Sequence, residues 1–310
     1  MKSLGYKLAC ILTLLCSFSS IATEEQVDVG AWSLGVNIGI GQRSAFITGQ
    51  DDLDIYLLPD FHYYGEAFFF DNGTLGYTFQ DQESYALSFI GELNPYGLYF
   101  EQSAFGESFN SLYLLDSSSI SGEATEGSNQ GSNLVSTDPG TPSFGNPNAP
   151  DFGPSFNSDV YSLPKPSLSL DAGIQANWFL TNSQELTVKF VKDISNKHSG
   201  LRGKFNWAVK QQFSQLKVRL NLGFDWLDNK ASNYYFGISP NDVSFNSAQY
   251  QTGSSINPFV SVTANIPITR SMSFVAHLKY LKLDSAIADS PMTSQSYSVT
   301  HFAGIHYKFW

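Results

Sequence analysis

The chain has 310 residues, a formal net charge of −11 at pH 7, 42% hydrophobic and 15% aromatic residues, and two cysteines. Both cysteines, Cys10 and Cys16, fall inside an expected secretion signal, so a disulfide, a thiol nucleophile and a cysteine metal site are excluded from the mature chain. No later segment is apolar for the roughly 20 residues that a membrane-spanning helix needs, which excludes a helical membrane protein.

The N-terminus has the pattern of a secretory signal peptide. Lys2 and Lys7 precede an apolar stretch over residues 8–18, and Ser20-Ile21-Ala22 supplies the small residues that a signal peptidase reads. The apolar stretch is too short for an uncleaved anchor helix. We therefore expect residues 1–22 to be removed after Ala22, leaving a single domain over residues 23–310.

Three long segments alternate strictly between apolar and polar or small residues, over residues 32–41, 168–178 and 216–226. A strand turns successive side chains to opposite faces, so each segment has one apolar and one polar face. Runs of this length suit a bilayer, which a tilted strand crosses in about 9–11 residues, better than a soluble sandwich, whose strands average about 5–6 residues. The abundant aromatic residues suit the interfacial girdles of a barrel. The sequence predicts an all-β fold, a transmembrane antiparallel up-and-down β-barrel exported to the outer membrane of a Gram-negative cell.

About 12 strands can be placed, with short connections at one end and longer ones at the other from the middle of the chain onwards. An even number puts both termini on the periplasmic side, where turns are short. Residues 53–115 are the weakest part, although Asp71-Asn72-Gly73 is a good hairpin turn, so 10 or 14 strands stay as alternatives. The predicted strands cover residues 31–41, 53–63, 65–71, 74–80, 84–91, 167–179, 184–193, 201–213, 216–227, 255–268, 271–283 and 297–309.

Residues 117–158 differ from the rest of the chain. Ser, Gly, Asn and Pro occupy 26 of these 42 positions, and Lys and Arg are absent. Such a segment cannot build a packed core, so we expect one long flexible loop on the outer face. It is either a variable surface region or an inert insertion, and the lack of any binding motif favours the second.

Charge is distributed unevenly along the chain. Residues 44–164 carry 17 acidic and no basic residues, whereas residues 165–310 carry 14 basic and 8 acidic ones. Charge on the lipid face costs about 2–4 kcal/mol at the midplane, so bases in the polar phase of the strands should face the lumen. They would either attract solutes in a pore or be consumed by ion pairs that plug it. The six bases, which we call the basic wall, are Lys189, Arg202, Lys204, Lys210, Lys217 and Arg219, and the acids expected opposite them are Asp54, Asp60 and Glu66.

Catalysis has weak support. Asp193, His198 and Ser199 are the only cluster with the ingredients of a nucleophile, a base and an orienting acid, but adjacent strand residues point apart and no nucleophile elbow accompanies them. The other histidines are single, without the spacing of metal ligands. We therefore expect a non-enzymatic protein with no catalytic, cofactor-binding or metal-binding residues and no cofactor. The remaining histidines are His62, His277, His301 and His306.

A set of short motifs, in this order and spacing, resembles the MipA/OmpV family of outer-membrane proteins, also described as the MltA-interacting protein family. The chain departs from the family pattern at Ile47-Thr48-Gly49, where Tyr-x-Gly is common, and at Trp310, which extends past the usual terminal Phe. The matching motifs are Leu58-Pro59, Tyr63-Tyr64-Gly65, Phe68-Phe69-Phe70, Asp193 with His198-Ser199-Gly200, Asn233 to Ser239, Asp289-Ser290-Pro291 and Tyr307-Lys308-Phe309.

The resemblance implies a scaffold or envelope protein linked to the peptidoglycan-synthesising machinery. Its implied partners are a lytic murein transglycosylase and a penicillin-binding protein, beside outer-membrane lipid; no nucleic-acid partner is expected. Other family members resemble general outer-membrane proteins. The alternative from the residues themselves is an outer-membrane pore whose basic wall draws small anionic or zwitterionic solutes.

Overall fold

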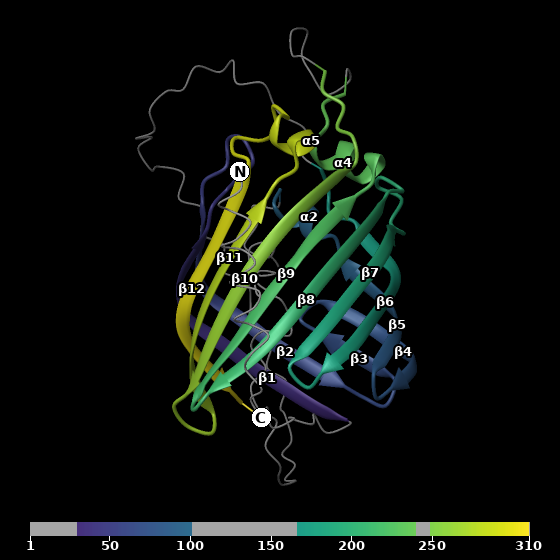
Figure 1. The fold of residues 1–310 in the computed structure, drawn as a ribbon. Helices are drawn as coiled ribbons and strands as arrows, with labels where there is room; N and C mark the ends of the chain where they lie inside the picture. Colours follow the sequence, from purple (N-terminus) through teal and green to yellow (C-terminus); the bar gives the residue numbers. More distant parts are fainter. Residues whose placement is uncertain (1–29, 101–165, 240–248, 310) are drawn as a thin grey trace, which may run out of the picture.

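The computed structural model describes residues 30–100, 166–239 and 249–309. Its strands form a closed antiparallel barrel in which each strand pairs with its sequence neighbours and β1 pairs with β12 (Figure 1). The predicted barrel and its count of 12 strands are confirmed. The predicted signal, residues 1–22, and the predicted loop, residues 117–158, lie outside the described residues.

Every strand boundary lies within three residues of its prediction. Where the alternation is strict, it marks where a strand is half buried. In β10 the side chains alternate between buried and exposed over nine residues, from Ser255 to Thr263. The difference reaches three residues at the starts of β3 and β6. At β3 the backbone N–H of Gly65 donates to the carbonyl of Phe68 and makes a turn of residues predicted as strand. The strands are β1 (Ala31–Arg43), β2 (Leu53–Tyr64), β3 (Phe68–Asp71), β4 (Thr74–Gln82), β5 (Tyr85–Leu93), β6 (Leu170–Thr181), β7 (Gln184–Asp193), β8 (Leu201–Phe213), β9 (Leu216–Leu227), β10 (Ser255–Pro267), β11 (Met272–Lys282) and β12 (Tyr297–Lys308).

The two ends of the barrel differ. Tight turns at 182–183, 214–215 and 268–271 form one end, which we call the turn end. The opposite end carries α2 (Pro95–Leu98), α4 (Asn229–Phe236) and α5 (Ser285–Ala288), and we call it the helix end (Figure 1). None of the described helices is long and apolar enough to cross a membrane.

Each helix begins at a side chain that accepts a hydrogen bond from a backbone N–H of its first turn. These N-cap residues are Asn94, Asp228 and Asp284. The helices and nearby loops then bury a cluster of mainly aromatic and aliphatic side chains, which we call the cap. The cap comprises Phe46, Ile47, Tyr96, Phe100, Leu227, Ala231, Tyr235, Phe236, Ile238, Phe259, Leu281, Leu283, Ile287 and Met292.

The barrel closes least extensively between β2 and β3. These strands share only three residue pairs, from His62↔Asp71 to Tyr64↔Phe69, and β3 and β4 share four, whereas each of the other neighbouring strands shares between eight and twelve. The reason is the early hairpin turn at Asn72 and Gly73, whose φ values of 40° and 94° fit a two-residue turn. We call this short junction the seam.

Candidate functional site

Four of the six bases of the basic wall form ion pairs with acids on nearby strands. Arg202 is 3% exposed, its Nη2 contacts Oε1 of Glu92 on β5, and its Nε lies 3.3 Å from Oδ2 of Asp171 on β6. The Nζ of Lys189 lies 3.1 Å from Oε2 of the same Glu92. Because a buried charge needs partners, these four residues form one ion-pair network inside the barrel.

A second group of charges lies nearer the turn end. Arg219 is nearly buried, and its Nη2 lies 3.6 Å from Oε2 of Glu185, while Nζ of Lys210 lies 3.9 Å from the same oxygen. The Nε of Arg219 also donates to Asn221 at 3.1 Å. Lys204, in contrast, lies towards the helix end, with its Nζ 5.3 Å from the ring centroid of Phe259, a cap residue.

The predicted acidic partners were wrong. Asp54 is exposed and accepts a hydrogen bond from Gln42, Glu66 is exposed in the turn before β3, and Asp60 is occupied by two histidines. The actual partners, Glu92 and Asp171 with Glu185, sit on β5 to β7, beside the basic strands rather than across the lumen. These ion pairs therefore run between nearby strands along the wall and not across the lumen as predicted.

Asp60 organises a separate polar cluster at the seam. Its Oδ1 lies 2.6 Å from Nε2 of His62, and its Oδ2 lies 3.1 Å from Nε2 of His306. The other ring nitrogen of His62, Nδ1, lies 2.9 Å from Oδ1 of Asp71 on β3. The side-chain amide of Asn72 also donates to Asp60, at 3.2 Å. This cluster holds the short seam together from the inside.

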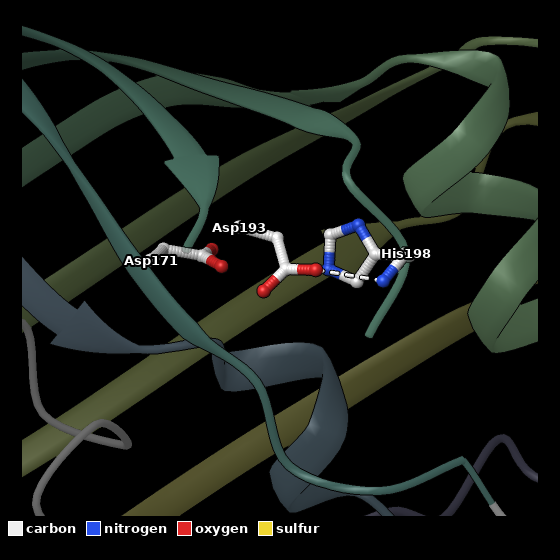
Figure 2. Close-up of side chains that lie close together, drawn as sticks. All are labelled: Asp171, Asp193 and His198. Atoms are coloured by element: carbon white, nitrogen blue, oxygen red, sulfur yellow. Dashed lines mark hydrogen bonds between the residues drawn. The ribbon is translucent and has the colours of Figure 1, made fainter. Parts of the chain in front are cut away.

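Asp171, Asp193 and His198 face one another at the helix end (Figure 2), with candidate ligand atoms within 4.8 Å. Their atoms, however, already bind protein groups. The two oxygens of Asp193 accept from the backbone N–H groups of Ser195, His198 and Ser199, and those of Asp171 accept from Asn94, Arg202 and Ser169. In Figure 2 the dashed bond runs from Asp193 to the main-chain nitrogen of His198, not to its ring. We assign this trio to folding the 194–200 loop rather than to holding a cation.

The His198 ring has the wrong proton arrangement for a general base. The Gly200 N–H donates to its Nδ1 at 3.0 Å, so the hydrogen of the neutral ring is on Nε2, which lies 3.2 Å from Oγ of Ser169. A base that activates Ser169 would need that nitrogen bare. Burial lowers the pKa of His198 and outweighs the nearby carboxylates of Asp193 and Asp171, which act to raise it. The lowered pKa favours the neutral ring.

Ser199, the predicted nucleophile candidate, does not meet His198. Its Oγ donates to Oδ1 of Asn196, and its backbone has a left-handed φ of 52° within the loop. Of the other histidines, His62 and His306 both contact Asp60 at the seam, Nδ1 of His277 lies 2.8 Å from Oγ1 of Thr263, and His301 is exposed on β12. The arrangement gives no nucleophile–base pair among these residues.

Sequence reasoning missed Glu92, Asp171 and Glu185 as the partners of the basic wall. A signal was present, because Asp171 lies in the polar phase of the alternating run 168–178, and Glu185 precedes Lys189 by four residues on one strand face. Phase alone does not say which strands touch, and the partners on β5 could not be assigned without the register.

The lumen also contains an apolar group midway along the barrel. Ile55 and Leu58 of β2 pack with Val275 of β11 and Phe302 of β12, and each is at most 4% exposed. Packed or ion-paired side chains therefore lie inside the barrel in this luminal cluster, in the cap and in the ion-pair networks.

Comparison with known proteins agrees with this architecture. The family model described as MltA-interacting protein MipA matches residues 34–309. The MltA-interacting protein of Escherichia coli (strain K12) is 21% identical over 304 residues, covering 98% of both chains. A relative named outer membrane protein YiaT, from the same strain, is 29% identical over 164 residues, covering 51% of this chain and 65% of that one, so the match spans just under two thirds of its length.

Two solved structures show a looser similarity. The translocator domain of the autotransporter NalP from Neisseria meningitidis has 8% identity and a TM-score of 0.38, with 99% of this chain and 95% of that chain covered. The COG4313 outer membrane channel from Pseudomonas putida F1 has 8% identity and a TM-score of 0.36, with 94% of this chain and 100% of that chain covered. The family match extends over nearly the whole barrel, from β1 to the end of β12. This outer-membrane β-barrel therefore belongs to the MltA-interacting protein MipA family.

Proposed function

We propose that the protein is a non-enzymatic scaffold of the cell envelope, exported by a cleaved signal peptide, that binds peptidoglycan-processing enzymes at the periplasmic face of the outer membrane. The observation that carries this proposal is that ion-paired and packed side chains lie inside the barrel. They are the four-residue network around Arg202, the cluster around Phe302 and the cap at the helix end.

The family supplies the partner class. A relative that covers 98% of this chain is named for an interaction with MltA, and the resemblance implies a lytic murein transglycosylase together with a penicillin-binding protein. Because its turns are short, the turn end is the face that we assign to the periplasm. A partner there would meet a compact rim rather than long loops.

Two measurements on the purified full-length barrel test the proposal. The first is planar-bilayer conductance, where we expect no steady current. The second is retention of purified murein transglycosylase and penicillin-binding protein on the immobilised barrel, with an unrelated outer-membrane barrel of similar size as the control. Retention of the enzymes without conductance supports the scaffold, and a barrel that retains neither enzyme contradicts it.

The alternative is a pore for small anionic or zwitterionic solutes. The observation in its favour is that basic residues outnumber acids on the inward phase of β8 and β9, where Arg202, Lys204, Lys210, Lys217 and Arg219 accompany a single acid, Asp225. Anion-selective current, lost on replacing Arg219 by Gln, would favour this pore over the scaffold.

A further inference from the structure

The seam leaves most of β2 without a neighbour on one side. Among the described residues, Leu53 to Asp60 pairs only with β1, because β3 reaches no further than His62. The pairing ends at Asn72: the backbone N–H of Phe61 donates to Oδ1 of Asn72 at 2.9 Å, and the N–H of Asn72 donates to the carbonyl of Phe61 at 3.1 Å. Residues 53–60 therefore form an edge in the wall of an otherwise closed barrel.

Proline occupies this edge. Alternate residues of an antiparallel strand send their N–H and C=O groups to opposite sides, so Leu57 and Pro59 direct theirs to the same side as Phe61, away from β1. Proline has no N–H to leave unmet, and it is found in sheets mainly on edge strands. Pro59 thus fits a permanent edge and disfavours the addition of another strand there.

Over residues 55–58 the edge is apolar on both of its faces. Ile55 and Leu58 point inward into the luminal cluster and are 3% and 1% exposed, whereas Tyr56 and Leu57 point outward and are 62% and 56% exposed. The in–out alternation of the other strands is broken at this place. Apolar side chains consequently lie both on the outer face of the edge and directly behind it.

This outer face is continuous with the barrel's interface with the bilayer. Ile38 and Ile40 of β1, which lie beside Leu57 and Tyr56, are 59% and 71% exposed on the same outer face. A bare backbone edge is costly in hydrocarbon, because its N–H and C=O groups find no partner there. The occupant of the edge must therefore offer both hydrocarbon and hydrogen-bonding groups.

We propose that the unpaired edge of β2 is a lipid-binding site in the barrel wall, which holds an acyl-chain amphiphile of the bilayer. Its chain lies along the edge beside Leu57 and Pro59, in front of Ile55 and Leu58. The site lies in the wall and is not a passage through the lumen. It goes beyond the scaffold function and does not depend on it.

The test places one fluorophore behind the edge. Because the mature chain has no cysteine, single variants can be labelled with bimane and reconstituted in vesicles of phospholipids with brominated acyl chains, which quench on contact. The variant I55C reports the edge. The matched control S261C is also inward-facing and buried, but lies between fully paired strands, and L278C faces the lipid. We expect a loss of fluorescence at positions 55 and 278 and none at 261.

Three results would overturn the site. Position 55 could be as unquenched as 261; it could be quenched by aqueous iodide alone, which means a water-filled gap; or an L57C variant could form disulfide-linked dimers in vesicles, which means that a second copy covers the edge. If the label at 55 prevents folding, judged by the heat-dependent shift on gels, L53C is the substitute, because Leu53 is only partly buried beside the same cluster. Quenching at 53 then supports the site, and its absence contradicts it.

Discussion

Arg202 and Glu92 meet inside the barrel although 110 residues separate them in the chain and two strands lie between β5 and β8. Their contact crosses β6 and β7 and takes in a partner from each, Asp171 and Lys189. It therefore ties together four consecutive strands through side chains, in addition to their backbone ladders.

Replacing Arg202 by Gln should destabilise the barrel strongly. It leaves Glu92 and Asp171 buried without their main partner, and breaking a buried pair on one side costs about 3–5 kcal/mol. The measurement is the temperature at which the folded band disappears on semi-native gels. Lys192→Gln, which removes an exposed charge from β7, is the control and should leave that temperature unchanged. Equal temperatures for the two variants would show that the network contributes little.

Acidification should loosen the 194–200 loop through His198. Its pKa is lowered in the folded protein, mainly by burial, from the ordinary value of 6.5, so the unfolded loop binds the proton more readily. The contribution to stability is therefore full above pH 6.5 and decreases as the pH falls through the lowered pKa. Hydrogen exchange of residues 194–200 at pH 8 and pH 5 measures this.

His198→Gln serves as the control for that loop, because glutamine does not titrate in this range. The difference in protection between the two pH values should shrink in this variant. An unchanged pH dependence would assign the effect to other groups facing the ring, namely Asp171, Asp193 and Asp228.

Asp193→Ala should unfold the same loop without unfolding the barrel. The carboxylate accepts from three backbone N–H groups and from Oγ of Ser195, and losing buried acceptors of this kind costs about 1–3 kcal/mol. Limited proteolysis should cut the variant within 194–200 under conditions that spare the wild type. If divalent cations protected the wild-type loop further, our assignment of Asp193 to loop folding rather than cation binding would be wrong.

Gly39→Ala should disturb the pairing of β1 with β12. A Cβ at Gly39 would collide with the carbonyl of Ala303 and come within 2.8 Å of the Phe302 ring, and overpacking of this kind costs about 1–3 kcal/mol. Gly91→Ala is the matched control, because the nearest atom to its Cβ is a carbonyl oxygen at 3.9 Å. Heat-dependent gel shifts compare the stability of the two variants. Equal loss of stability would mean that β1 can shift away from β12 and relieve the collision without loss of stability.

The predicted strands from residue 167 onwards match the structure closely because their two faces meet different solvents, and a one-residue error would put polar groups on the apolar side. The region of β2 and β3 was harder to predict for a physical reason. Residues 55–58 and 68–70 are apolar on consecutive positions, so alternation there does not indicate where strands end. The seam is located in this region.

For the candidate site, sequence showed which bases face inward but not which acids they meet. Lys189, Arg202 and Arg219 were assigned from strand phase, which is a local property. Their partners depend on the register of β5 to β8, which is set by turn lengths and by the long connection between Leu93 and Leu170. The helices at the helix end were missed because α2 and α5 have four residues each, too few to show a period of 3.6.

The cap imposes an order on assembly. It combines side chains from the loops that follow β1, β5, β9 and β11, and the bridge between Ile47 and Thr293 joins the first of these loops to the last. A chain whose final hairpin has not yet inserted therefore cannot close its helix end, however well its earlier strands are paired. An incompletely assembled barrel would leave its helix end open, and the cap closes that end only when β12 pairs with β1.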